Sequence, residues 1–152
     1  MKNIGIWLIR IALLLLLAGL YFGHLASESY RLAEPKSGVM GFLSLRPLHV
    51  SSAYLGIITA GLGFLTLIIA KMKTTRFGTF LQYLHFSLWI IALLGIFYSY
   101  FTGDFGGREY WEFNPVWALP IFISFIVFLV FYLHQVGFSM KWPVYYWMWL
   151  TG

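Results

Sequence analysis

The chain contains no cysteine among its 152 residues. Disulfides, iron–sulfur clusters, thiolate metal sites and thioether-linked haem are therefore excluded for this chain. Charged residues are also scarce, at 10% of the sequence, whereas a soluble domain carries about a quarter. Because so few charges cannot cover a surface that faces water, we predict that lipid surrounds most of the chain.

Long apolar runs take the place of the missing charges. Four of them are long enough to cross a bilayer as helices, which takes about 20 residues each. They lie at residues 5–24, 48–70, 79–101 and 115–136. The first run has no A-x-A site after it, so we expect a retained span and not a cleaved signal peptide.

The fold class follows from these runs. We predict a single all-α domain over residues 1–152, an integral membrane bundle of four transmembrane helices plus a short C-terminal apolar segment at 142–150. Residues 25–46 are predicted to form an external loop, since they are more polar and contain proline and glycine. Gly19 and Gly23 have the small-xxx-small spacing that lets a neighbouring helix approach closely.

The positions of the charges indicate an orientation. The short loop from Lys71 to Arg76 carries three bases, and short basic loops favour the cytoplasmic side. We therefore predict a cytoplasmic N-terminus, which places all five acidic residues outside. The net charge of +5 does not indicate nucleic-acid binding, because the bases stand between apolar runs and form no stripe.

Ionisable residues near lipid are candidates for function, because polar groups are costly there. His49 follows Arg46 and Pro47, and proline suits the first turn of a helix. We therefore expect His49 just inside the membrane, with Arg46 above it. A neutral imidazole below a cation suits an axial haem ligand with propionates reaching the arginine. The alternative is an interfacial histidine bonded to a carbonyl group.

The polar loop between the third and fourth runs is a second candidate. Arg108 is placed to pair with a propionate, and Glu109 and Glu112 would share one side of a helical turn. Two carboxylates beside propionates would suit calcium, which takes several oxygen ligands. The alternative is a solvated loop whose Arg–Glu pair has little energetic weight.

The remaining histidines allow two further pairings. His85 and His134 could face each other on antiparallel helices and hold a second haem, or each could be packed and hydrogen-bonded on its own. His24 and His49 could form a bis-histidine pair at the outer face.

Two motifs carry a resemblance to a known family. Leu45-Arg46-Pro47-Leu48-His49 opens the second run, and Gly107-Arg108-Glu109-Tyr110-Trp111-Glu112 joins the third run to the fourth. In order, spacing and membrane side the chain from about residue 41 resembles the N-terminal part of subunit I of the haem–copper oxidase superfamily. It is most similar to cbb-type cytochrome oxidases and the large subunit of nitric oxide reductases. Residues 142–152 look like the start of the family's fifth span.

The resemblance implies roles for five residues. His49 would ligate the iron of a low-spin haem b, and Arg46 and Arg108 would lie near its propionates. Glu109 would help to hold a calcium ion, and Glu112 would be linked to proton uptake. The family also implies the bacterial cytoplasmic membrane and a cytochrome c-type or quinol electron donor.

The chain departs from the family in its length. The second ligand of haem b and the histidines of the binuclear centre belong to later spans that this sequence lacks. The resemblance therefore implies no catalytic residue here, and a partner chain that carries the remaining spans and the binuclear centre. The acceptor, oxygen or nitric oxide, stays open. So do two other functions: a self-contained membrane cytochrome b that exchanges electrons with quinol, and a non-redox accessory membrane protein.

Overall fold

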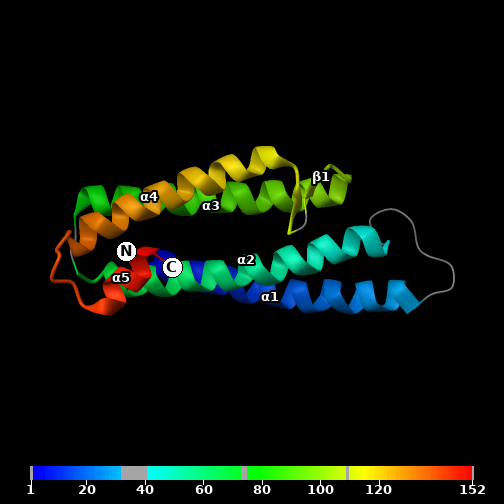
Figure 1. Cartoon of the computed structure of the whole chain (residues 1–152), viewed down its shortest axis with the longest axis horizontal. Helices are drawn as coiled ribbons and strands as arrows, with labels where there is room; N and C mark the ends of the chain where they lie inside the picture. Colours follow the sequence, from blue (N-terminus) through cyan, green and yellow to red (C-terminus); the bar gives the residue numbers. More distant parts are fainter. Residues whose placement is uncertain (1, 32–40, 73–74, 109, 152) are drawn as a thin grey trace.

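The computed structural model describes residues 2–31, 41–72, 75–108 and 110–151 (Figure 1). Within these ranges four helical stretches are long and apolar enough to cross a membrane, which confirms the predicted all-α bundle of four spans. The elements are α1 (Lys2–Arg31), α2 (Phe42–Ile69), α3 (Arg76–Thr102), β1 (Phe105–Arg108), β2 (Trp111–Phe113), the 3₁₀ helix η2 (Pro115–Trp117), α4 (Ala118–Val136) and α5 (Val144–Thr151).

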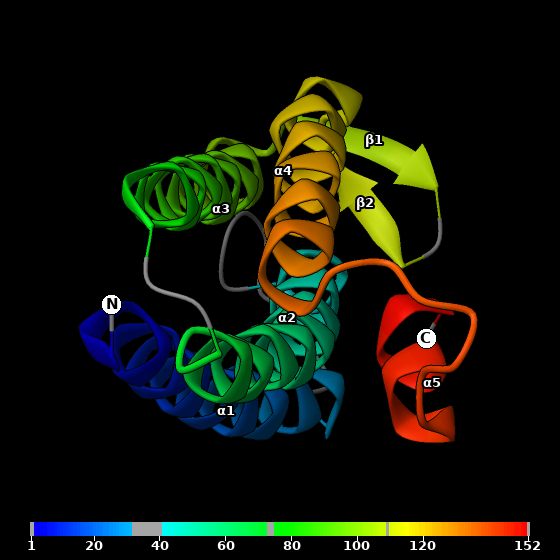
Figure 2. The same cartoon turned by 90° about the vertical axis from the view of Figure 1, so that its left-hand side faces the viewer.

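The long helices form two antiparallel pairs, α1 with α2 and α3 with α4 (Figures 1 and 2). Glycines let α1 and α2 approach closely: a Cβ on Gly63 would lie 3.0 Å from the carbonyl oxygen of Gly5. Between the described residues of these four helices, two hydrogen bonds join the pairs. Trp89 Nε1 donates to Thr59 Oγ1 at 2.9 Å, and Ser51 Oγ lies 2.6 Å from the Tyr100 hydroxyl.

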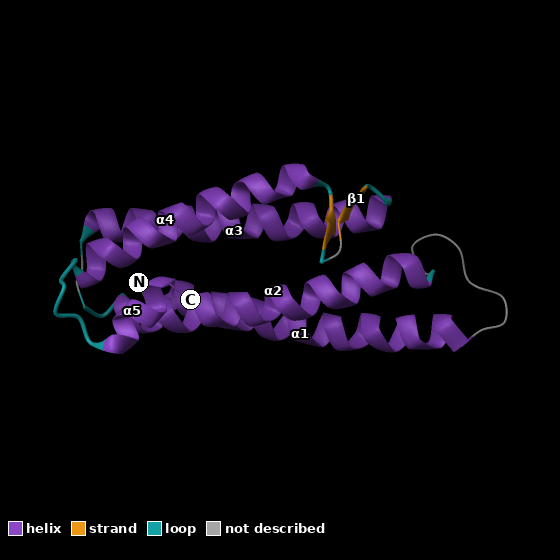
Figure 3. Ribbon diagram, in the orientation of Figure 1, coloured by secondary structure: helices purple, strands orange, loops and turns teal. Residues whose placement is uncertain are grey.

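The bundle has two distinct ends. At the hairpin end, α2 begins, α3 ends, and the strands β1 and β2 connect α3 to the start of the last span (Figure 3). At the opposite end, here called the loop end, α2 and α4 finish and α3 begins. The short helix α5 also lies there, and Tyr132 of α4 donates a hydrogen bond to the carbonyl oxygen of Tyr146 at 2.7 Å. With eight residues α5 is too short to cross a bilayer, as predicted.

Local signals set the bounds of α3 and the start of the last span. Thr75 caps α3 by accepting a hydrogen bond from the Gly78 amide at 3.0 Å, and Gly103 ends it with φ 74°. Asn114 accepts a hydrogen bond from the Val116 amide at 3.0 Å, where η2 begins at Pro115. The predicted third and fourth spans, 79–101 and 115–136, therefore agree closely with the observed helices.

The predicted external loop at 25–46 is wrong at both ends. Helix α1 continues to Arg31 and α2 begins at Phe42, which leaves residues 32–40 outside the described part of the chain. The extensions pack on each other, with the rings of Tyr30 and Phe42 centred 5.3 Å apart. Hydropathy marks only what lipid must cover, and these helices are longer than the bilayer requires.

Pro47 was expected in the first helical turn but lies inside α2, because that helix begins at Phe42. Proline lacks the amide hydrogen that would bond to the carbonyl of Leu43, so the ladder of α2 is interrupted just before His49.

The segment after α3 is also different from expectation. Instead of a helical turn that places Glu109 and Glu112 on one side, an antiparallel hairpin pairs Phe105 with Phe113 and Arg108 with Trp111. Aromatic residues favour strands, and Phe113 is 1% exposed and packs edge-on against Tyr100. Burying Phe113 anchors the hairpin to α3. Glu109 lies outside the described residues.

Candidate functional site

His49 is held between α1 and α2 at the hairpin end. Its Nδ1 lies 2.7 Å from the carbonyl oxygen of Gly19, and a Cβ on Gly23 would lie 2.7 Å from the same nitrogen. Only glycine at position 23 leaves room for the imidazole. The Gly19–Gly23 spacing predicted close helix contact, which is confirmed. The sequence did not indicate that these two glycines also accommodate the His49 side chain.

This contact determines which nitrogen of the His49 ring carries the proton. A carbonyl oxygen only accepts hydrogen bonds, so Nδ1 of His49 must carry the proton and donate it to Gly19. In neutral His49 the lone pair is then on Nε2, and no hydrogen bond between described residues engages that atom. An Nδ1–H bonded to a carbonyl is the usual arrangement that orients an imidazole ligand and makes its Nε2 more basic.

An apolar cavity of about 480 Å³, widely open on one side, lies beside His49. Its walls come from one face of α2 and from the turn of the hairpin: His49, Val50, Ala53, Tyr54, Ile57, Tyr110 and Trp111. The volume is within the range of cofactor and ligand pockets, which runs from roughly 300 to 1,000 Å³. Apolar walls with one imidazole suit a planar, mostly apolar group bound through iron. The two aromatic hairpin residues, Tyr110 and Trp111, were not predicted to line a site.

Charged residues stand close in sequence to those that line this cavity. Arg46, one turn before His49, forms an ion pair with Glu112 of β2, with Nη2 and Oε1 2.5 Å apart. Arg108 is exposed on β1. The pair connects α2 to the hairpin across 66 positions of sequence and brings the motif around His49 to the motif around Glu112. The guanidinium has five N–H donors, so binding Glu112 does not exhaust it.

The other histidines do not join His49. His24 is exposed on α1. His85 is buried against α4, where its Nδ1 lies 3.0 Å from the carbonyl oxygen of Ser124, whereas Nε2 of His134 lies 2.7 Å from Thr75 Oγ1. The structure thus places His85 and His134 at different levels, each in its own hydrogen bond, and does not bring their rings together for a second haem.

No group of three or more histidine or carboxylate side chains gathers in the described part of the chain, so these residues alone form no metal cluster. Glu112 is engaged by Arg46, and Glu109, the other predicted calcium ligand, is outside the described ranges. The calcium site therefore stays a prediction.

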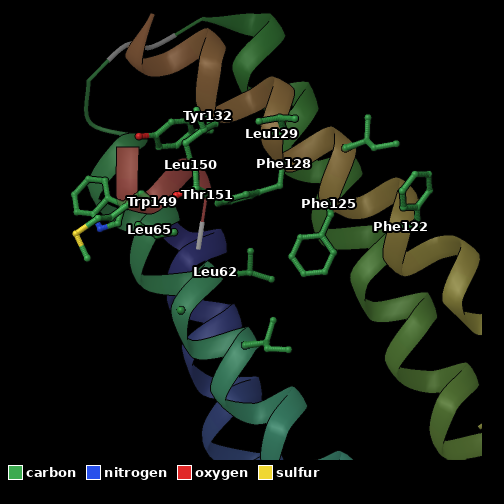
Figure 4. Close-up of a pocket in the computed structure, with 14 residues that line it drawn as sticks. Leu62, Leu65, Phe122, Phe125, Phe128, Leu129, Tyr132, Trp149, Leu150 and Thr151 are labelled. Carbon is green, nitrogen blue, oxygen red and sulfur yellow. The ribbon is translucent and has the colours of Figure 1, made fainter. Parts of the chain in front are cut away.

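A second cavity of about 570 Å³ opens between α2, α4 and α5 at the loop end (Figure 4). Its walls are mainly side chains of leucine, isoleucine and phenylalanine, including Leu62, Phe125 and Leu129. None of the lining residues is a histidine, a carboxylate or a base. It offers space for an apolar chain, such as that of a lipid, but no metal ligand.

Comparison of the chain with known protein families, with curated proteins and with solved structures found no match.

Proposed function

We propose that this chain is a membrane subunit of a respiratory haem–copper-type oxidase or nitric oxide reductase, and that it supplies one axial ligand of a low-spin haem b. The observation that carries the proposal is the state of His49. Its Nδ1–H is anchored on Gly19, its Nε2 keeps a lone pair, and an apolar cavity adjoins it. Histidine held in this way is a good ligand for haem iron.

The charged residues at the hairpin end support the same assignment. Arg46 lies directly above His49, and Arg108 belongs to the strand that leads into the cavity wall. Two guanidinium groups at the membrane surface would neutralise propionates while the ring remains in the apolar layer. Glu112 would hold Arg46 in place through their ion pair, in addition to the proton-uptake role that the resemblance implies. Calcium would join through Glu109.

The remaining parts of the function belong to partners. Neither His85 nor His134 lies near His49, so the second axial ligand would come from another chain, which would also carry the binuclear centre. Electrons would arrive from a cytochrome c-type or quinol donor, and a haem held by His49 would supply the redox chemistry. The complex would lie in the bacterial cytoplasmic membrane with the N-terminus of this chain in the cytoplasm.

The test is a reduced-minus-oxidised optical spectrum of the complex that co-purifies with this chain in mild detergent. We expect a haem b signal in the wild type and its loss in His49→Ala, because the axial ligand is removed. His24→Ala is the matched control, since it removes an exposed histidine at the same end of the bundle and should leave the spectrum unchanged.

Three results would contradict the proposal. An unchanged spectrum in His49→Ala would refute the ligand assignment. Haem b in the isolated chain would favour a self-contained cytochrome b. A complex without haem would favour a non-redox accessory protein.

A further inference from the structure

Buried polar groups without a protein partner cluster toward the loop end of the bundle. Among the described residues, nine buried side-chain nitrogen or oxygen atoms lack a hydrogen bond. Six of them come from four side chains, on α2, α3 and α4: Thr66 Oγ1, both amide atoms of Gln82, His85 Nε2 and both amide atoms of Gln135. The first three residues are at most 2% exposed and Gln135 is 5% exposed.

The helical register brings these side chains to neighbouring levels. Gly78, Gln82, His85 and Trp89 follow one another at intervals of four, three and four along α3, so they lie on one face of that helix. Gln135 of α4 is next to Gly78, because a Cβ on Gly78 would collide with its side-chain amide.

Helix α2 contributes Thr66 to the same region. Ser51 of α2 contacts Tyr100 of α3, and Thr59 contacts Trp89. Thr66 lies on the same side of α2, about two helical turns after Thr59. Since α2 and α3 are antiparallel and Thr59 meets Trp89, Thr66 lies at the level of Gln82. Three helices thus contribute buried polar groups to the loop-end half of the core.

His85 needs a further hydrogen-bond partner in this part of the core. Its Nδ1 lies 3.0 Å from the carbonyl oxygen of Ser124 and 2.8 Å from Ser124 Oγ, so Ser124 engages that nitrogen of the ring twice. The Nε2 atom is buried and has no hydrogen-bond partner among the described residues. Leaving such a group unsatisfied costs roughly 1–3 kcal/mol, and six such atoms together would destabilise the bundle severely.

The burial of these atoms limits what can satisfy them. Each is shielded within this chain, so a side chain of a partner subunit does not reach it, and lipid chains carry no hydrogen-bonding groups. Water is small enough and both donates and accepts, and buried water typically makes about three hydrogen bonds to groups of this kind. We propose that a file of internal water molecules runs from the loop end along Gln135 and Gln82 to Thr66 and His85.

The file would be open at one end only. At the loop end it begins beside Thr75 and His134, which are joined by a 2.7 Å hydrogen bond where α3 starts. At the other end Trp89 donates to Thr59, which donates to the carbonyl oxygen of Leu55 at 2.6 Å, and this closed chain leaves no donor for water. His85 lies nine residues into α3, about 14 Å from its start at a rise of 1.5 Å per residue.

The length of this file of water molecules and its single open end indicate what it would do. Water would reach about halfway through a hydrocarbon core of roughly 30 Å, and would give the His85 imidazole contact with the aqueous phase on one side of the membrane. This water-filled half-channel is independent of haem binding, because it lies at the opposite end of the bundle from His49.

Water-edited solid-state NMR on the full chain in lipid bilayers tests the proposal. The chain contains only two glutamines, so ¹⁵N labelling of glutamine gives two side-chain signals that Gln82→Leu and Gln135→Leu assign. We expect rapid transfer of magnetisation from water to both amide groups and to His85 Nε2. Trp89 Nε1, which is buried but bonded directly to Thr59, is the internal control and should receive little.

The variants test the path itself. Gln82→Leu should abolish the transfer to His85 and leave the transfer to Gln135, because Gln135 lies nearer the open end. Transfer to the glutamines and to His85 as slow as that to Trp89 would overturn the proposal and would indicate a dry network of side chains. Transfer to His85 that persists in Gln82→Leu would overturn the path along Gln82. Neither result depends on haem, so the outcome is separate from that of the spectral test.

Discussion

The close contact between Gly23 and His49 gives a prediction that compares the stability of two glycine-to-alanine variants. In Gly23→Ala the new Cβ would lie 2.7 Å from Nδ1 and 2.8 Å from Cε1 of the imidazole, and 3.0 Å is already shorter than ordinary contacts of a Cβ atom. The ring cannot retreat without breaking its hydrogen bond to Gly19. Gly61→Ala is the matched control, because a Cβ on Gly61 meets nothing within 4 Å.

The magnitudes follow from the two sites. Overpacking costs about 1–3 kcal/mol, and losing the hydrogen bond adds roughly 1 kcal/mol. Replacing glycine with alanine inside a helix returns about 0.5–1 kcal/mol in both variants. We therefore expect Gly61→Ala to be slightly stabilised, and Gly23→Ala to unfold with a free energy roughly 2–4 kcal/mol lower than that of Gly61→Ala.

The assay is reversible unfolding of the purified chain in mixed micelles, with loss of helical circular dichroism followed as the fraction of denaturing detergent rises. The same Gly23→Ala variant should also weaken the haem b signal of the co-purified complex, since the ligand is displaced. Equal stability of Gly23→Ala and Gly61→Ala would refute the placement of His49 between α1 and α2.

Three further variants test other contacts. Gly95→Ala should destabilise the bundle by at least the 1–3 kcal/mol typical of overpacking, because its Cβ would enter the indole of Trp117, and the same unfolding assay measures it. Glu112→Gln should cost less than about 1 kcal/mol and lose its effect in high salt, because its partner Arg46 is 44% exposed; an equal loss at all salt concentrations would contradict a screened ion pair. Tyr100→Phe should cost about 1 kcal/mol by removing a buried hydrogen bond to α2, with no effect if the two helix pairs do not meet there.

Much of the fold could be predicted from hydropathy alone. A span must bury its backbone in helix and cover it with apolar side chains, so the four runs and the too-short α5 followed from length and composition. The extensions of α1 and α2 were missed because Glu28 and Arg31 are compatible with helix outside lipid, where they pair at 3.2 Å. Hydropathy does not predict where a helix ends once it has left the membrane.

The hairpin shows a different limit. Glu109 and Glu112 have helical spacing, yet the segment forms strands, because burying Phe113 against Tyr100 outweighs local spacing. Tertiary contacts of this kind decide the structure of a short polar segment, and they are not encoded in the segment itself.

The candidate site was partly predictable. His49 was singled out because a histidine and an arginine are costly near lipid. Its contact with Gly19, 30 positions away, and the pairing of Arg46 with Glu112, 66 positions away, depend on how the helices pack. A pattern within one span cannot show which face its neighbours will cover.

The arrangement in two pairs has a consequence for biogenesis. Helices α1 and α2 are consecutive in the sequence and pack on each other, as do α3 and α4 (Figure 1). Each pair can therefore enter the membrane and close as a unit while the ribosome is still extending the chain. The pairs must then find one alignment, and the hydrogen bonds at Thr59 and Ser51 define it. A slip of one helical turn, about 5.4 Å, would break both at once. These two hydrogen bonds thus determine the alignment in which the two helix pairs finally assemble.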